Sequence, residues 1–294
     1  MDRLIKIALV CCLVSTAQAW SQSDANPPEQ MPAASFSQFQ CTGFISGERV
    51  PDSIRVYNGA DNDLYEALHT FTPGSLVYLR GTDHSFNPGE AFSLVRPENG
   101  FFLNYKWLPG MISNQVLPFS SNYKHQRLGV ERLGHPYDNI GLVRVVRVTP
   151  EGAIARVEFA CTAVNPQDIA VPYVPEAIPE YAQGASFDPY APSNGKLEGT
   201  IVAANAASSF LANGSIAFLN IGENRGVRPG QRYRIYVEFR DNLFMGLEDF
   251  HSALKTPRET VGELIILHVQ DKASEGIVVS SRREILIGDG VELE

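Results

Sequence analysis

The sequence has few cysteines and a deficit of positive charge, and each shortage excludes a class of protein. Only 4 of its 294 residues are Cys, which excludes a miniature fold held together by disulfides. The chain is long enough for two domains, each with its own core. Lys and Arg number 24 against 33 Asp and Glu, giving a net charge of -9. Because phosphate backbones attract basic surfaces, we expect no nucleic-acid partner.

The sequence also lacks recognisable catalytic and metal-binding motifs. Its 6 His residues form no His-Glu-x-x-His pair, and no Gly-x-Ser-x-Gly elbow is present. Asp83-His84 is the nearest approach to a ligand pair, but zinc needs three or four convergent ligands. The acidic pairs Asp61/Asp63 and Glu248/Asp249 lie beside short helix-like stretches, where carboxylates ordinarily cap helices and aid solubility. We therefore expect a non-enzymatic protein with no metal and no cofactor.

The beginning of the chain has the pattern of a signal peptide. Arg3 and Lys6 accompany an apolar run over 7–14, and Ala17-Gln18-Ala19 supplies the small residues of a cleavage site. The run is too short to span a bilayer, so no transmembrane segment is expected in the mature chain. Residues 1–19 are thus predicted to be removed on export. The expected location is the periplasm or the outer surface of a Gram-negative-type bacterium.

Cleavage leaves two cysteines, Cys41 and Cys161. In an oxidising compartment an even, well-separated pair is typical of a disulfide. A zinc site and a catalytic thiol are the alternatives. The pair has no Cys-x-x-Cys spacing and no nearby His to complete a zinc site, and an oxidisable partner is unsuited to a nucleophile.

Composition divides the mature chain into four parts. Residues 20–39 are rich in Ser, Gln, Pro and Ala and predict a flexible leader. Residues 172–194 are crowded with proline and tyrosine, which predicts an extended linker. The parts between and after them, 40–171 and 195–294, are the candidate folded modules.

The two candidate modules repeat one pattern. In each, a short apolar strand leads to a Pro-Gly turn and a second strand, and Gly141 to Asp168 has the same spacing as Gly262 to Asp289. We predict an all-β fold of two homologous small β-barrel-like modules joined by the Pro-rich linker, with short helical insertions. The residues expected to shape the turns are Gly81, Pro88, Gly89, Gly222, Gly226, Pro229, Gly230, Asp168 and Asp289.

The hairpin that ends each module differs between the copies. Residues 153–159 alternate apolar and polar, which is the signature of a strand with one buried face. In the second copy, 264–267 and 277–279 are apolar on both faces. That pattern predicts a hairpin covered on both sides.

Three strings of the second copy resemble a known family. They are IGENRGVRPG over 221–230, VGELIIL over 261–267 and SSRREILIGD over 280–289. They look like a small β-barrel module of bacterial envelope proteins, which occurs C-terminal to peptidoglycan-binding LysM domains and is similar to the C-terminal part of flagellar assembly protein T. The resemblance covers 41–168 and 197–292. The resemblance implies a non-catalytic role in the envelope, through contact with envelope proteins or peptidoglycan. The specific form of this role is a structural assembly factor. Oligomers are compatible with such a role.

The stretch 101–132 is rich in aromatic and basic side chains. Aromatic rings beside local positive charge suit a glycan or another anionic polymer, which would make this an accessory peptidoglycan-binding site. The alternative is a hairpin whose rings fill the barrel and whose charges face water. The matching insertion, 239–260, predicts an amphipathic helix. The candidate binding residues are Phe102, Tyr105, Trp107, Lys124, Arg127 and Arg132.

Overall fold

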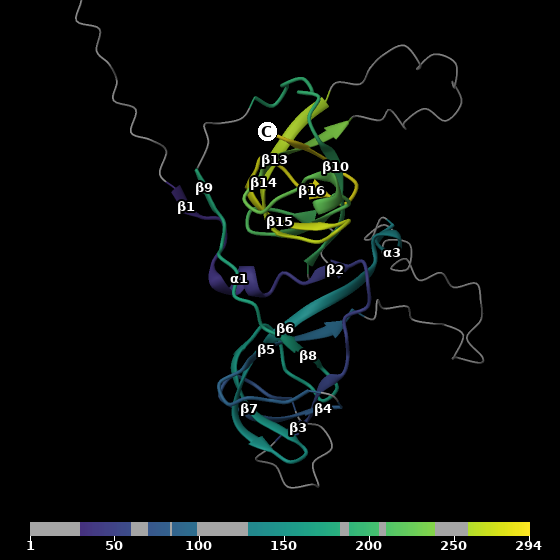
Figure 1. Cartoon of the computed structure of the whole chain (residues 1–294). Coiled ribbons are helices and arrows are strands. Elements are labelled where there is room, and N and C mark those ends of the chain that lie inside the picture. The colour runs from purple at the N-terminus through teal and green to yellow at the C-terminus, as the bar shows by residue number, and fades with distance from the viewer. Residues whose placement is uncertain are drawn as a thin grey trace, which may run out of the picture.

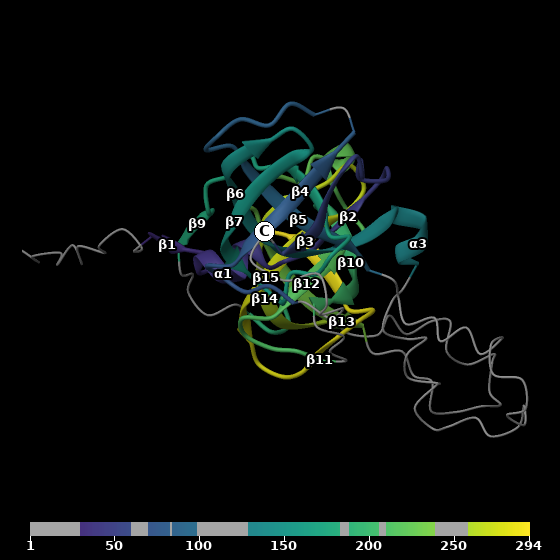
Figure 2. The ribbon, with the colours of Figure 1, turned by 90° about the horizontal axis from the view of Figure 1, so that it is seen from below.

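The computed structural model describes residues 30–59, 70–82, 84–98, 129–182, 188–205, 210–238 and 258–294. These residues are mostly strands and form two barrels, which confirms the all-β, two-module prediction. Figure 1 shows the second barrel above the first, with a short connector between them. In the view from below the two barrels overlap, so they are stacked along one direction (Figure 2).

The first barrel closes because its longest strands pair with each other. Around the ring the strand order is β6-β5-β8-β3-β4-β7, and β6 pairs again with β7. The short strand β2 extends this sheet beside β6. The bounds are β2 Phe44–Ser46, β3 Ile54–Gly59, β4 Leu76–Gly81, β5 Ala91–Pro97, β6 His135–Thr149, β7 Gly152–Ala160 and β8 Ile169–Pro172.

The second barrel repeats this arrangement strand for strand. Its closed ring runs β10-β12-β15-β14-β13-β17, so strands that correspond in chain order occupy corresponding places in the two rings. The bounds are β10 Glu198–Ala204, β12 Ile216–Leu219, β13 Arg232–Glu238, β14 Arg258–Val269, β15 Ser274–Ser281 and β17 Gly290–Leu293. A smaller pair, β11 Phe210–Leu211 and β16 Ile285–Leu286, lies outside the ring.

The turns of the two barrels also match in their hydrogen bonds. The backbone N–H of Gly89 donates to the carbonyl of Val145 at 2.8 Å, and that of Gly230 donates to Ile266 at 2.8 Å. Both glycines have a positive φ, +85° and +82°, which glycine adopts without a Cβ penalty. Pro88 and Pro229 precede them, so each copy forms the same tight turn.

Asp168 and Asp289 shape a second pair of equivalent turns. The Oδ2 atom of Asp168 accepts the N–H of Asn165 at 2.7 Å, and that of Asp289 accepts the N–H of Leu286 at 2.8 Å. An aspartate that accepts a nearby backbone N–H stabilises a local turn. Asp168 also forms an ion pair with Arg96, whose Nε lies 2.7 Å from Oδ1.

Each barrel encloses its own apolar core. Val77, Leu79 and Phe92 belong to the cluster that fills the first, and Leu219, Ile235 and Leu264 to the cluster that fills the second. Packed apolar side chains thus occupy the barrel interiors, as expected for small barrels. Gly81 ends β4 close to the rim residues Ile54 and His84.

The N-terminal stretch differs from the predicted flexible leader. From residue 30 it forms strand β1 (Gln30–Pro32), which pairs with β9 (Glu180–Ala182), and then helix α1 (Phe36–Gln40). A capping box of Ser35 and Gln38 starts the helix, and Phe39 on it is buried. Composition missed this because the buried residues are few and are held by distant parts of the chain.

The Pro-rich linker is extended, and it is held against the second barrel. The carbonyl of Pro189 accepts the N–H of Thr260 at 2.7 Å, and the carbonyl of Pro192 accepts Arg234 Nη2 at 2.7 Å. Proline carbonyls remain available as acceptors even though proline has no N–H to donate. The linker thus runs along the barrel surface.

Two short helical elements complete the described residues, α3 (Val130–Leu133) and the 3-10 turn η3 (Glu223–Arg225). Gly222 and Gly226 flank η3, and Gly226 has φ +82°. The insertion helices expected near 64–70 and within 239–260 fall almost wholly outside the described residues. Among the described helices, none has the length and apolar character needed to cross a bilayer.

Candidate functional site at the junction of the two modules

The two barrels meet through a connector, which we define as residues 33–46. It contains α1 and β2 and lies between the barrels in Figure 1. The predicted disulfide is confirmed: Cys41 and Cys161 are bonded, with their Cα atoms 5.5 Å apart. Since Cys161 directly follows β7, the bond fixes the connector to the first barrel.

Helix α1 covers an outer face of the second barrel. Phe39 is 1% exposed and belongs to one cluster with Ile265, Leu267 and Ile277. The opposite faces of the same hairpin, including Leu264 and Val278, fill the barrel interior. The prediction that this hairpin is covered on both sides is therefore confirmed, and the connector is its outer cover.

Strand β2 carries the connector along the junction. It pairs with β6 of the first barrel, and the rings of Phe44 and Tyr137 stack with their centroids 5.3 Å apart. Ile45 faces the second barrel and joins a cluster with Val202 and Ala203 of β10. A three-residue strand thus contacts both modules.

A close contact between the backbone at Gly43 and the backbone of β6 allows β2 to lie between the two modules. Its φ is +72°, and a Cβ there would lie 2.8 Å from the carbonyl oxygen of Tyr137. Only glycine meets both demands without strain. Nearby, the Nδ2 atom of Asn205 donates to the carbonyl of Cys41 at 2.8 Å, which adds a polar tie from the second module.

His268 of β14 contributes a second polar tie. Its Nε2 lies 3.0 Å from the carbonyl oxygen of Phe39, and its Nδ1 lies 2.9 Å from Oε2 of Glu176 in the linker. The imidazole also packs on the Phe39 ring, with centroids 4.1 Å apart. One side chain thus joins the barrel, the connector and the linker.

Glu275 of β15 is the most unusual side chain of the junction. It has no solvent exposure, and its Oε1 accepts the N–H of Ile45 at 3.4 Å. Its Oε2 has no hydrogen-bond partner. Burial raises the pKa of this carboxyl group to about 8, because a charge is poorly solvated there.

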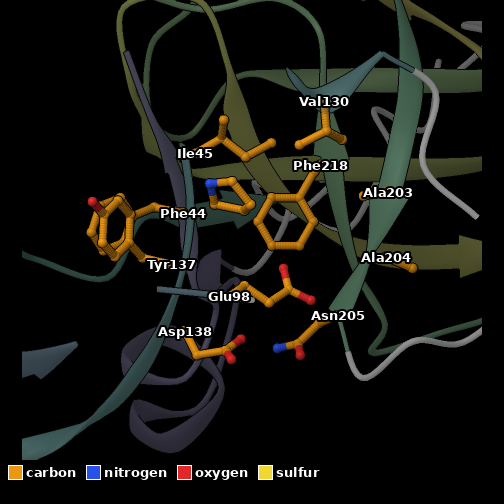
Figure 3. Close-up of a pocket in the computed structure, with 11 residues that line it drawn as sticks. Phe44, Ile45, Glu98, Val130, Tyr137, Asp138, Ala203, Ala204, Asn205 and Phe218 are labelled. Carbon is orange, nitrogen blue, oxygen red and sulfur yellow. The ribbon is translucent and has the colours of Figure 1, made fainter. Parts of the chain in front are cut away.

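A small pocket opens at the same junction. Its cavity volume of about 30 Å³ suits a water molecule or two rather than a larger ligand. In Figure 3 the side chains of Glu98, Asp138 and Asn205 point toward a common region below the ring of Phe218. Val130 of α3 forms part of the wall.

A wider groove, of about 150 Å³, lies beside the connector. Its walls come from the connector, the linker and both barrels, and they include Thr42, Tyr173 and His268. The junction therefore offers a shallow, mostly polar surface next to the buried contacts.

Of the predicted binding residues, the structure places only Arg132. It is exposed in the last turn of α3, whose Val130 lines the small pocket. The others, Phe102, Tyr105, Trp107, Lys124 and Arg127, lie outside the described residues. Glu98, the last described residue before these five, also lines the pocket.

Sequence reasoning missed the importance of His268 and Glu275. Both lie in the hairpin that is apolar on both faces, so a polar residue there was the available signal. A titratable side chain in a doubly covered strand requires a specific partner or a neutral form.

The described residues contain no group of three or more His, Cys, Asp or Glu side chains placed to hold a metal ion. No protein-family model matches the chain, and no curated protein is significantly similar to it.

Proposed function

We propose that this protein is a non-enzymatic, exported component of the cell envelope that acts through contact with other envelope proteins or with the cell wall. A structural assembly factor is the specific form of this role. The observation that carries the proposal is the junction itself, where a disulfide-fixed connector joins two closed barrels of the same topology. Such an arrangement presents surfaces at defined relative positions, which suits a scaffold.

Three further points support this proposal. The disulfide and the lack of a membrane-spanning helix among the described residues are compatible with export. Because apolar side chains fill both barrels, a partner would contact their outer surfaces. The resemblance of the repeated module to envelope barrels suggests the same compartment.

A second candidate is an accessory glycan-binding role for the segment between Glu98 and Gly129. It is favoured by the described residues on either side of this segment, since Glu98 and Val130 both line the junction pocket and Arg132 is exposed nearby. Aromatic rings stack on sugars, and arginines attract anionic groups. Peptidoglycan would be the ligand.

Co-sedimentation with insoluble peptidoglycan sacculi tests both candidates. Purified residues 20–294 are mixed with sacculi at low and high salt, beside an inert secreted protein. Pelleting that salt weakens supports cell-wall contact through charge. If the protein stays in solution, chemical crosslinking in the envelope followed by capture tests for a protein partner, and failure to crosslink any envelope component reproducibly contradicts the scaffold role.

Matched variants then locate the contact. Trp107→Ala and Arg127→Ala abolish pelleting if the aromatic and basic segment binds the glycan. Arg80→Ala serves as the control because Arg80 is exposed on β4 of the first barrel, away from the junction residues. Equal pelleting of all three variants contradicts the glycan-binding candidate.

A further inference from the structure

His268 and Glu275 occupy directly opposed positions in one hairpin. They are cross-strand partners in the β14–β15 register, so their side chains leave the same face of the sheet. That face is the outer one that the connector covers, and each side chain contacts the connector backbone, at Phe39 and Ile45 respectively. Two titratable groups thus hold one segment.

His268 holds the connector beside Glu275. Its two ring nitrogens face a carboxylate oxygen of Glu176 and the backbone carbonyl oxygen of Phe39. A ring N–H donated to the Phe39 carbonyl ties the connector to β14.

In the part of the chain that the structure describes, Glu275 is buried without a charged partner. It is fully buried, one of its oxygens has no partner, and the other accepts a single long hydrogen bond. Glu292 is equally buried but is paired with Arg234 and Arg258. Because no such cation contacts Glu275 among the described residues, the closed junction favours its neutral acid form.

The other charges around the junction do not reverse this preference of Glu275. No residue of the connector has an ionisable side chain apart from the bonded Cys41. The linker contributes Glu176 and Tyr173, and the negative charge of Glu176 raises the pKa of Glu275 further. The remaining groups are Glu98 and Asp138 on the first barrel, Glu131 and Arg132, both exposed, on α3, and Asp271 and Lys272 on the turn after β14.

We propose that the junction is a proton-operated latch, closed while Glu275 is neutral and released when Glu275 loses its proton. Acidity therefore favours the closed form. The disulfide and the pairing of β2 with β6 keep the connector on the first barrel. Release therefore uncovers the apolar outer face of the second barrel around Ile265, Leu267 and Ile277.

Hydrogen exchange of the connector amides tests this latch in the full mature chain. Protection factors, each taken relative to an unstructured peptide at the same pH, are measured for residues 39–45 between about pH 5 and about pH 9. Opening that releases one proton lowers protection about tenfold per pH unit between the pKa values of the open and closed states. Glu275→Gln keeps an acceptor for the N–H of Ile45 but cannot ionise, so its protection is expected to lose this dependence on pH.

Glu151→Gln is the matched control, since Glu151 is exposed on the turn between β6 and β7, and it keeps the wild-type slope. Amides of β17 report whether the second barrel stays folded. Wild-type protection that does not change with pH, or a wild-type slope that persists in Glu275→Gln, overturns the latch.

Discussion

Two buried glutamates of the second barrel, Glu275 and Glu292, show how surroundings decide the state of a carboxyl group. Burial raises the pKa of Glu292, but hydrogen bonds from Ser193 and Arg234 outweigh it and the pKa is lowered. Glu275 has no cationic partner among the described residues, and its pKa is raised. The same residue type is thus held charged in one place and neutral in the other.

Replacing Glu292 is expected to destabilise the second barrel strongly. Glu292→Gln leaves the nearly buried Arg234 without its counter-charge, and breaking a buried ion pair costs about 3–5 kcal/mol. Urea denaturation followed by circular dichroism measures the loss. The exposed control Glu223→Gln should change stability by no more than about 0.5 kcal/mol, and a similar small change for Glu292→Gln would contradict the ion pair's role.

Replacing Glu275 is expected to change how stability depends on pH. The group has a pKa of about 8 in the folded chain against an ordinary value of 4.5, so the folded state holds the proton more tightly. Its contribution is fully present below about pH 4.5 and is lost as the pH rises toward about 8. In Glu275→Gln this decline should vanish. Denaturation midpoints measured across that range check it, and parallel profiles of the two proteins would refute it.

At the scale of elements, the repeated strands depend on close backbone contacts at equivalent glycines. A Cβ on Gly141 would lie 2.3 Å from the carbonyl oxygen of Phe159, and one on Gly262 would lie 2.5 Å from that of Ser280. Gly141 of β6 pairs with Ala160 of β7, and Gly262 of β14 pairs with Ser281 of β15. Close packing of the backbone at this point is therefore a property of the module rather than of one copy.

Alanine at either glycine is expected to destabilise its own barrel. Overpacking of this kind costs about 1–3 kcal/mol because neighbouring backbone must move. Gly141→Ala and Gly262→Ala are compared by chemical denaturation with Gly47→Ala, where no atom lies within 4 Å of the added Cβ. A control that loses as much stability as the two test variants would show that the close contacts are not the cause.

Removing the disulfide is expected to cost stability and to loosen the connector. Cys41→Ser with Cys161→Ser opens a loop spanning 120 residues, and loss of a native disulfide typically costs about 2–5 kcal/mol. Guanidinium denaturation of the double variant measures this. Wild-type protein under reducing conditions should match it, and unchanged stability in both cases would contradict a structural role for the bond.

The elements were more predictable than the junction, for a physical reason. The turn residues Gly89 and Gly230, and the hairpins after Gly141 and Gly262, are local patterns, so the barrels could be inferred from the sequence. The contacts of His268 with Phe39 and of Glu275 with Ile45 join positions 229 and 230 residues apart. No local pattern encodes such pairings, although the apolar outer face of β14 and β15 did indicate that something covers it.

At the scale of the whole molecule, Phe39 is one of the side chains that couple the two barrels. Phe39 is carried by a helix bonded to the first barrel and is buried against the second. Phe39→Ala is expected to cost about 3–5 kcal/mol and to separate the unfolding of the barrels. Calorimetry should show two transitions instead of one. Ser37→Ala is the control, because Ser37 is exposed on the same helix. A single unshifted transition in both variants would contradict the coupling.

The disulfide also constrains the order in which this chain matures. Cys41 and Cys161 both precede the second barrel in the sequence, so their bond can form while residues 195–294 are still emerging. Domains generally fold as units in the order of synthesis, N-terminal first. The first barrel then presents Phe39 and Ile45 before the second barrel has folded. The second barrel, which is synthesised last, completes its folding against these two side chains.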